Sequence, residues 1–261
     1  MNFQKYLFPL CLFTLFSCQE NSNTVLIEPI NDKDEDVSKI RSESQNISQN
    51  FVCYWDSLML ENGLVNVINV DSTLIVDLKY SSTENFMDTD MYGCLNNCYL
   101  QPDVAKKLKL AQKLLKSKNP ELNLLIWDGT RPRSVQEFMW NSLKMPDHEK
   151  RNFVSDPKSG SLHNFGAAVD LTIVRTKDSI PIDMGTEYDH FSVLAWPIKE
   201  KEMLKNNRLK KIHIHNRKLL RKIMSKAGFS ILQTEWWHFN SMTRDEAAKK
   251  YTIIEGPLKG K

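Results

Sequence analysis

The sequence lacks the features that mark several specialised classes of protein. It has no internal repeat and none of the motifs that bind nucleic acid. Its 35 Lys and Arg nearly balance its 32 Asp and Glu, so the formal net charge of the 261 residues is only +3. With 41% hydrophobic and 26% charged residues, it has the composition of an ordinary globular protein, and we expect no nucleic-acid partner.

A hydrophobic run long enough to cross a bilayer is also missing. The apolar stretch at residues 6–16 is too short for a membrane-spanning helix, but after the polar stretch that carries Lys5 it predicts a signal peptide over residues 1–17. Residues 15–18, Leu-Phe-Ser-Cys, resemble the lipobox of bacterial lipoproteins. We therefore expect a lipid anchor on Cys18 that holds the protein outside the cytoplasm on a bacterial membrane. A plain secretory signal is the alternative.

Residues 18–50 have few aromatic side chains and little periodicity. They are rich in Asn, Ser, Asp and Glu, and they cannot bury enough apolar surface to offset the entropy of ordering. This composition predicts a flexible linker, and the folded domain is expected to span residues 51–261.

Few cysteines are present, and three of the five fall in this domain: Cys53, Cys94 and Cys98. Export permits disulfides. The short Cys-x3-Cys spacing favours a bond between Cys94 and Cys98 over a metal role for the same two residues. A bond from Cys53 to either of them is also open, and one thiol must stay unpaired within the monomer.

Mixed strand and helix patterns predict an α+β fold. Two short strands are expected within residues 64–80, and others at 122–127, at 166–174 and from 229 onward. Apolar residues recur at helical spacing in three segments, which predict three helices. One follows Pro102, a second starts from an N-cap at Ser134, and a third is a basic helix over residues 205–227 that ends at Gly228. Because strict β-α-β alternation is absent, we expect one domain with a small central, largely antiparallel sheet flanked by helices.

Residues 161–170, Ser-Leu-His-Asn-Phe-Gly-Ala-Ala-Val-Asp, contain two groups that can bind a metal. His163 lies in a loop, and Asp170 interrupts an otherwise apolar strand. A carboxylate in that setting is partly buried and needs a cation or hydrogen bonds. The structural alternative is an aspartate that caps a turn, with a histidine on the surface.

A second chemical segment is Glu-Trp-Trp-His at residues 235–238. A regular strand would put Glu235 and His238 on opposite faces, so the two converge only if the backbone bends. Without such a bend, His238 is more typical of a packed aromatic cluster.

Together the two segments supply two histidines and an aspartate, the ligand set of a zinc ion that keeps one position open for water. Glu235 is then the candidate base that takes a proton from this water. The helical His-Glu-x-x-His motif of other metallopeptidases is absent. Arg131, in the turn Asp-Gly-Thr-Arg-Pro, is a candidate to stabilise an oxyanion, and a surface salt bridge is the alternative.

These motifs resemble the D-alanyl-D-alanine dipeptidases of the VanX type, within a zinc peptidase group that also includes D,D-carboxypeptidases. The resemblance covers residues 67–240 and depends on Ser-x-His-x-x-Gly-x-Ala-x-Asp, Glu-x-Trp-His and Trp-Asp-Gly-x-Arg-Pro in this order. Weaker matches are at residues 77–80 and 184–189. Family members usually have an aromatic residue where Thr130 stands, and this difference concerns the fine fit of the substrate.

The resemblance implies one zinc ion per chain, bound by His163, Asp170 and His238. It implies that Glu235 is the general base and later the proton donor, and that Arg131 stabilises the transition state. It places three further residues around the free amino end of the substrate: Tyr80, Ser161 and Asp189. His148, His190, His213 and His215 receive no role, and the basic run over residues 199–222 is interpreted as a solvated helix face.

The leading hypothesis is therefore zinc-dependent hydrolysis of D-alanyl-D-alanine, or of a closely similar small cell-wall dipeptide. One alternative is a D,D-carboxypeptidase or endopeptidase that acts on longer peptidoglycan stem peptides. Another is a noncatalytic zinc-binding module of the envelope, against which Glu235 argues because a binding module has no need of a base.

Overall fold

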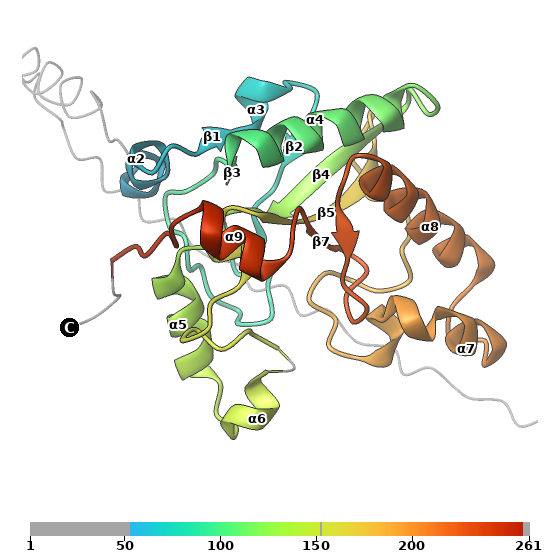
Figure 1. Cartoon of the computed structure of the whole chain (residues 1–261). Helices are drawn as coiled ribbons and strands as arrows, with labels where there is room; N and C mark the ends of the chain where they lie inside the picture. Colours follow the sequence, from blue (N-terminus) through green and yellow to red (C-terminus); the bar gives the residue numbers. More distant parts are fainter. Residues whose placement is uncertain (1–52, 152, 258–261) are drawn as a thin grey trace, which may run out of the picture. The chain divides into compact units, whose positions relative to one another are not determined.

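A five-stranded sheet is the centre of the structure, a computed structural model that describes residues 53–151 and 153–257 (Figure 1). Its strand order is β2-β4-β5-β7-β6, and the strands span Ile75–Val76, Leu122–Asp128, Ala168–Arg175, His238–Asn240 and Ser230–Ile231. β2 and β4 are parallel, whereas the other three pairings are antiparallel. The prediction of an α+β domain with a small, largely antiparallel sheet is confirmed.

Two long helices, α4 (Pro102–Lys116) and α8 (Lys211–Lys226), pack against one another, and α4 also contacts β4. The remaining helices are α2 (Tyr54–Glu61), α3 (Val67–Val70), α5 (Arg133–Ser142), α6 (Asp147–Lys150), α7 (Glu200–Lys205) and α9 (Arg244–Lys250). A separate two-stranded sheet pairs β1 (Val65–Asn66) with β3 (Tyr99–Leu100). In β5, seven of eight residues are buried, so this strand is covered on both faces.

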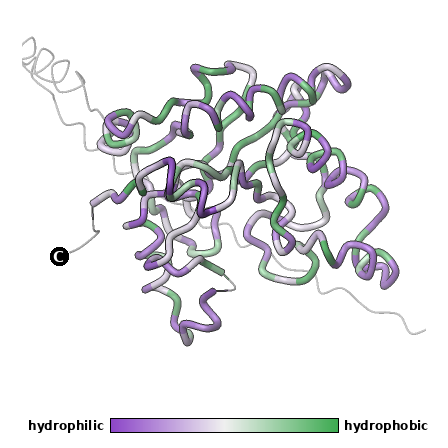
Figure 2. Tube along the Cα trace, in the orientation of Figure 1, coloured by the Kyte–Doolittle hydropathy of each residue, from purple (hydrophilic) through white to green (hydrophobic). Residues whose placement is uncertain are grey.

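The sequence of α4 explains its position. Pro102 at its start is preorganised for a first helical turn. Its buried residues recur at helical spacing and include Val104, Leu108, Ala111 and Leu115, while its lysines lie on other faces. Figure 2 shows the resulting alternation of hydrophobic and hydrophilic stretches along the helix.

Some of the predicted segments cannot be compared with the structure. The signal peptide at residues 1–17, the lipid-bearing Cys18 and the linker at 18–50 lie outside the described residues, and the domain boundary at residue 51 stays a prediction. In the described part of the chain, no helix is long and apolar enough to cross a membrane.

Residues 64–80 form less strand than expected. β1 ends at Asn66, and the helical turn α3 takes the place of a continued strand. The reason is local, because the Asn66 side chain accepts a hydrogen bond from the Ile68 backbone N–H at 3.1 Å and so caps a helix start. Ser134 is no N-cap, because α5 already begins at Arg133 after Pro132.

The helix predicted over residues 205–227 begins later than expected, as α8 at Lys211, because residues 206–210 form a turn after α7. α7 ends at Lys205 and α8 begins at Lys211, and Asn207 between them has a left-handed φ of 54°. Asparagine tolerates that conformation better than most residues. The turn allows Leu209 to pack with Met203 and Ile214 in a small apolar cluster, which a straight helix would prevent.

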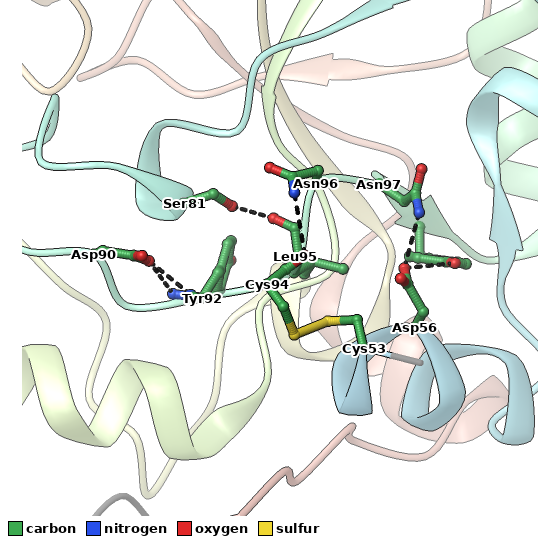
Figure 3. Close-up of a disulfide and its surroundings, with 11 residues drawn as sticks. Cys53, Asp56, Ser81, Asp90, Tyr92, Cys94, Leu95, Asn96 and Asn97 are labelled. Carbon is green, nitrogen blue, oxygen red and sulfur yellow. Dashed lines mark hydrogen bonds between the residues drawn. A yellow bond between two sulfur atoms is a disulfide. The ribbon is translucent and has the colours of Figure 1, made fainter. Parts of the chain in front are cut away.

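The disulfide joins Cys53 to Cys94, so the favoured pairing of Cys94 with Cys98 was wrong (Figure 3). Asp56 of α2 accepts hydrogen bonds from the Asn97 side chain at 3.0 Å and the Tyr99 hydroxyl at 2.8 Å, which holds α2 beside Cys94. Cys98 is buried as a free thiol and packs against Gly129, where an added Cβ would lie 2.4 Å from its sulfur. Spacing along the chain does not determine which way a cysteine points.

We expect this disulfide to contribute to stability by restricting the unfolded chain. Its partners are 41 residues apart, and the chain-entropy relation for a loop of that size predicts a loss of about 4 kcal/mol in the free energy of unfolding for Cys53→Ala. Urea unfolding under nonreducing conditions measures the change. Cys98→Ala is the matched control, which retains the bond. A peptide map that links Cys94 to Cys98 in the unmodified protein would contradict the assignment.

Candidate metal centre and substrate pocket

Three side chains predicted from separate motifs meet at one buried point. His163 lies in a 3-10 turn over Leu162–Phe165, Asp170 on β5 and His238 at the start of β7. The antiparallel register of β5 and β7 places Asp170 opposite His238. His238 Nδ1 lies 3.0 Å from Asp170 Oδ1, and His163 Nε2 lies 3.1 Å from His238 Nδ1 and 3.4 Å from Asp170 Oδ1.

The outer nitrogen of each imidazole is held by an oxygen. His163 Nδ1 lies 2.7 Å from the Gly129 carbonyl oxygen, and His238 Nε2 lies 2.7 Å from Asn240 Oδ1. Both oxygens can only accept a hydrogen bond, so these nitrogens carry the hydrogens. The lone pairs of the other two nitrogens then point toward Asp170, as in many metal sites where the outer contact fixes the ring.

The spacing of the three inner atoms fits a metal ion. Zinc ligands at about 2.0–2.2 Å in a tetrahedron lie about 3.3–3.6 Å from one another, close to the 3.0–3.4 Å found here. Two facing lone pairs and a carboxylate also repel each other unless a cation lies between them. Within the described residues, His163, Asp170 and His238 are the group of at least three potential ligands that meets these conditions.

The charge distribution at the cluster favours a cation. Burial raises the pKa of Asp170, but the nearby His163 and His238 outweigh burial and hold that pKa well below its usual range. Burial lowers the pKa of His238, but the hydrogen bonds to Asp170 and Asn240 and the charges of Asp170 and Glu235 together raise it to about 9, so that a metal ion would displace a proton from Nδ1 on binding. Asp170 therefore stays ionised, and its negative charge attracts positive charge to this point.

Glu235 reaches the same site because the backbone bends, as the hypothesis required. Residues 232–237 connect β6 to β7 and are not part of a strand. Glu235 Oε2 lies 4.0 Å from His238 Nδ1. Trp236 and Trp237 are buried in an edge-to-face pair and anchor the bend. Burial raises the pKa of Glu235, although His238 opposes it, so this carboxylate is a better proton acceptor than an exposed one.

Arg131 is buried and points inward, so the surface salt bridge was the wrong alternative. Its Nε and Nη2 donate to Asp128 Oδ2 at 2.9 and 2.6 Å, and its Nη2 lies 3.8 Å from Asp170 Oδ2. Asp128 is fully buried at the end of β4 and also accepts a hydrogen bond from Tyr92 at 2.7 Å. Sequence reasoning missed Asp128, although its place three residues before Arg131 in the same turn was a usable signal.

The expected amino-end residues are also brought together. The Tyr80 hydroxyl donates to Asp189 Oδ2 at 3.1 Å, and burial, with Asp170 as a second cause, raises the pKa of Asp189 well above its usual range. Tyr188, which had no assigned role, donates to Asp170 Oδ2 at 2.9 Å. The Ser161 hydroxyl oxygen is buried and belongs to the capping box that Ser161 forms with Asn164 at the start of the 3-10 turn.

A cavity of about 730 Å³ opens onto these groups. Its lining includes all three members of the His–Asp–His cluster together with Tyr80, Arg131, Ser161, Asp189 and Glu235. Thr130 does not line it, because its side chain is buried and donates to the Tyr99 carbonyl at 2.6 Å. The departure from the family pattern at Thr130 therefore lies behind the turn, away from the substrate.

Comparisons with known proteins find a family match and several curated relatives. The model of the M15 peptidase family, described as D-Ala-D-Ala dipeptidase, matches residues 60–254. The D-alanyl-D-alanine dipeptidase of Escherichia coli K12 is 29% identical over 180 residues, which cover 67% of this chain and 83% of that protein. The D-alanyl-D-alanine dipeptidase of Enterococcus faecium is 31% identical over 187 residues, which cover 65% of this chain and 86% of that protein.

One solved structure, of the LD-carboxypeptidase LdcB, covers 58% of this chain and 63% of its own. Its sequence is 19% identical and its TM-score is 0.33, a likeness too weak to support a conclusion.

The contact from Asn240 to His238 gives a prediction about metal affinity. Asn240→Ala removes the oxygen that fixes the outer nitrogen of the ring, and loss of such a partner typically weakens metal binding about 10- to 100-fold. Competition for Zn²⁺ with a chromophoric chelator measures this change. Asn97→Ala is the matched control, since that amide contacts Asp56 instead of the cluster. Equal Zn²⁺ affinity in the Asn240 variant and the unmodified protein would show that the ring needs no such support.

Proposed function

This chain belongs to the M15 family of D-Ala-D-Ala dipeptidases, and on that premise we propose that it hydrolyses D-alanyl-D-alanine, or a closely similar small cell-wall dipeptide, with one zinc ion. The observation that carries this proposal is the convergence of His163, Asp170 and His238 beside Glu235 in one cavity. The metal supplies a bound water of lowered pKa and polarises the peptide carbonyl.

Glu235 performs the proton transfers in this proposal. It accepts a proton as the water oxygen bonds to the carbonyl carbon, and it gives that proton to the leaving nitrogen as the carbon–nitrogen bond breaks. Its raised pKa suits both steps, because it lies nearer to neutral pH than that of an exposed glutamate. Its side chain is 27% exposed and lines the cavity, so it can reach a substrate.

Arg131 is placed to stabilise the negative charge that develops on the carbonyl oxygen. Its two hydrogen bonds to Asp128 fix the guanidinium plane, and its position 4.7 Å above the Tyr80 ring limits its movement. A donor held in this way needs no reorganisation when the charge appears. Asp128 acts through Arg131 as a positioning residue.

The amino end of the substrate is recognised by charge. Burial and Asp170 raise the pKa of Asp189, and the positive charge of an ammonium group beside it would lower that pKa again, so the two would form an ion pair. Tyr80 holds this carboxylate through its hydroxyl. Ser161 lines the same cavity and is a further polar residue beside the expected position of the amino group. This arrangement favours a dipeptide with a free amino group over a longer chain whose nitrogen is an uncharged amide.

A second candidate function is a D,D-carboxypeptidase or endopeptidase on peptidoglycan stem peptides. The cavity favours it in one respect, since about 730 Å³ is more space than two alanyl residues fill. A noncatalytic zinc-binding module is less consistent with the site, because Glu235 lies beside the cluster with its pKa raised.

The expected lipid anchor on Cys18 belongs to the same proposal. A chain anchored outside the cytoplasm meets fragments of the cell wall or dipeptides from the medium, rather than the cytoplasmic pool. We therefore propose a role in the turnover of such peptides.

The deciding experiment is release of D-alanine from D-alanyl-D-alanine by the purified protein. We expect release that stops with a zinc chelator and returns with added Zn²⁺. Glu235→Gln should keep Zn²⁺ bound while the rate falls about 100- to 10,000-fold, the usual contribution of a general base. No release by a folded, zinc-loaded protein would refute the dipeptidase proposal, and release from a stem pentapeptide alone would establish the second candidate.

Asp189→Asn tests how the amino end is recognised. The change removes the charge and keeps the shape, so we expect KM for D-alanyl-D-alanine to rise about tenfold or more, with a smaller change in kcat. Steady-state kinetics measure both quantities. Glu187→Gln is the matched control, an exposed carboxylate on the same loop that does not line the cavity. An unchanged KM in the Asp189 variant would place the ammonium elsewhere.

A further inference from the structure

We propose that the buried polar face of α8, formed by His213, Asn216 and Arg217, fixes the loop at residues 183–194 and thereby positions Asp189 for the substrate's amino end. Arg217 is the central positioning residue of this face. The loop supplies Asp189, His190 and Phe191 to the cavity although it contains almost no regular structure. The inference rests on the proposed function for its kinetic consequence, but its structural part can be measured independently.

Two side chains of α8 hold the first end of the loop. His213 Nε2 lies 3.0 Å from Asp183 Oδ2, and the Asn216 side-chain amide donates to the Asp183 carbonyl at 2.7 Å. The His213 ring also fills the space beside Gly185, where an added Cβ would lie 2.4 Å from Nδ1. Gly185 has a φ of 83°, so both its conformation and its closeness to the ring require glycine.

Arg217 connects the two ends of the loop. Its Nε donates to the Met184 carbonyl at 2.7 Å, and its Nη1 donates to the Leu194 carbonyl at 2.9 Å. One planar guanidinium thus fixes the separation of two backbone segments that are ten residues apart in the sequence. His213, Asn216 and Arg217 share one face of α8, because residues three and four apart on a helix are neighbours.

The burial of Arg217 indicates that these contacts matter. Its side chain is fully buried, and burial lowers its pKa to about 10, so it still carries its charge at neutral pH. Glu200 compensates that charge from 3.6 Å. A buried guanidinium is retained at the cost of its hydration, and the carbonyl groups of the loop replace the lost water.

The conformation of the loop depends on being held. Asp189 has a left-handed φ of 54°, which is unfavourable for a residue with a side chain and persists only where the surrounding structure imposes it. Tyr188 beside it reaches Asp170, and Asp189 reaches Tyr80. A change in the separation of the loop ends therefore moves the carboxylate that receives the ammonium group.

Arg217→Lys tests this inference in the full zinc-loaded chain. Lysine keeps the positive charge near Glu200, but its single nitrogen cannot bridge the carbonyls of Met184 and Leu194 as the two guanidinium nitrogens do. We expect KM for D-alanyl-D-alanine to rise about tenfold with kcat changed less than threefold and Zn²⁺ affinity unchanged. Amide hydrogen exchange in residues 183–194 should become faster.

Arg221→Lys is the matched control. Arg221 lies one turn further along α8 and makes two hydrogen bonds to Glu200 at 2.7 Å, but it makes no contact with the loop in the described structure. We expect its exchange rates in the loop and its KM to remain those of the unmodified protein. Arg217→Met removes both the charge and the hydrogen bonds. It should therefore raise KM and speed amide exchange in the loop more than Arg217→Lys does.

Unchanged loop exchange in folded Arg217→Lys would overturn the inference, whatever the activity of the protein. If the unmodified protein hydrolyses the dipeptide, faster loop exchange in Arg217→Lys with an unchanged KM would also overturn the inference. If the unmodified protein releases no D-alanine, the proposed function fails, and the exchange measurement still decides whether α8 fixes the loop.

Discussion

The pairing of β5 with β7 is the constraint on which the site depends. Its register sets Asp170 directly opposite His238 in the interior of the sheet, where a carboxylate and an imidazole lie within hydrogen-bonding distance. A shift of this pairing by one residue would move one of the two side chains to the other face. Because hydrophobic residues on both strands bury the pairing, its register is strongly specified. The backbone therefore sets the relative positions of Asp170 and His238.

The groups around this pair are held from several separate elements. The turn after β4 supplies Gly129 for His163 and the Asp128–Arg131 pair, and the bend before β7 supplies Glu235. α8 fixes the loop that carries Asp189. The contact of His163 with Gly129 and that of Arg217 with the loop join residues far apart in the sequence, whereas the Asp128–Arg131 pair lies within one turn. Catalytic groups held in this way keep their relative positions without help from the substrate.

The Cys53–Cys94 bond illustrates how little of this assembly follows from local sequence. The spacing of Cys94 and Cys98 favoured a short loop, but Cys98 turns inward to pack on Gly129, beneath the turn that supports His163. The direction of each thiol was decided by the packing of α2 and of the turn, neither of which is encoded within the Cys-x3-Cys segment. The same holds for residues 205–227, where packing in a small apolar cluster favours a turn at residues 206–210 in place of the first part of the predicted helix.

The sequence by itself determined the kind of fold and identified the candidate residues of the site. An aspartate in an apolar strand, a histidine in a loop before it and a Glu-Trp-Trp-His segment sufficed to predict the ligand set and the base, because buried charge requires a partner. Only the tertiary structure decided which groups support them: Asp128 behind Arg131, Asn240 behind His238, and Arg217 behind the loop of Asp189. The contact from Arg217 joins segments far apart in the sequence. The Asp128–Arg131 and Asn240–His238 contacts are local, but the turn and the strand register determine the side-chain directions that let them form.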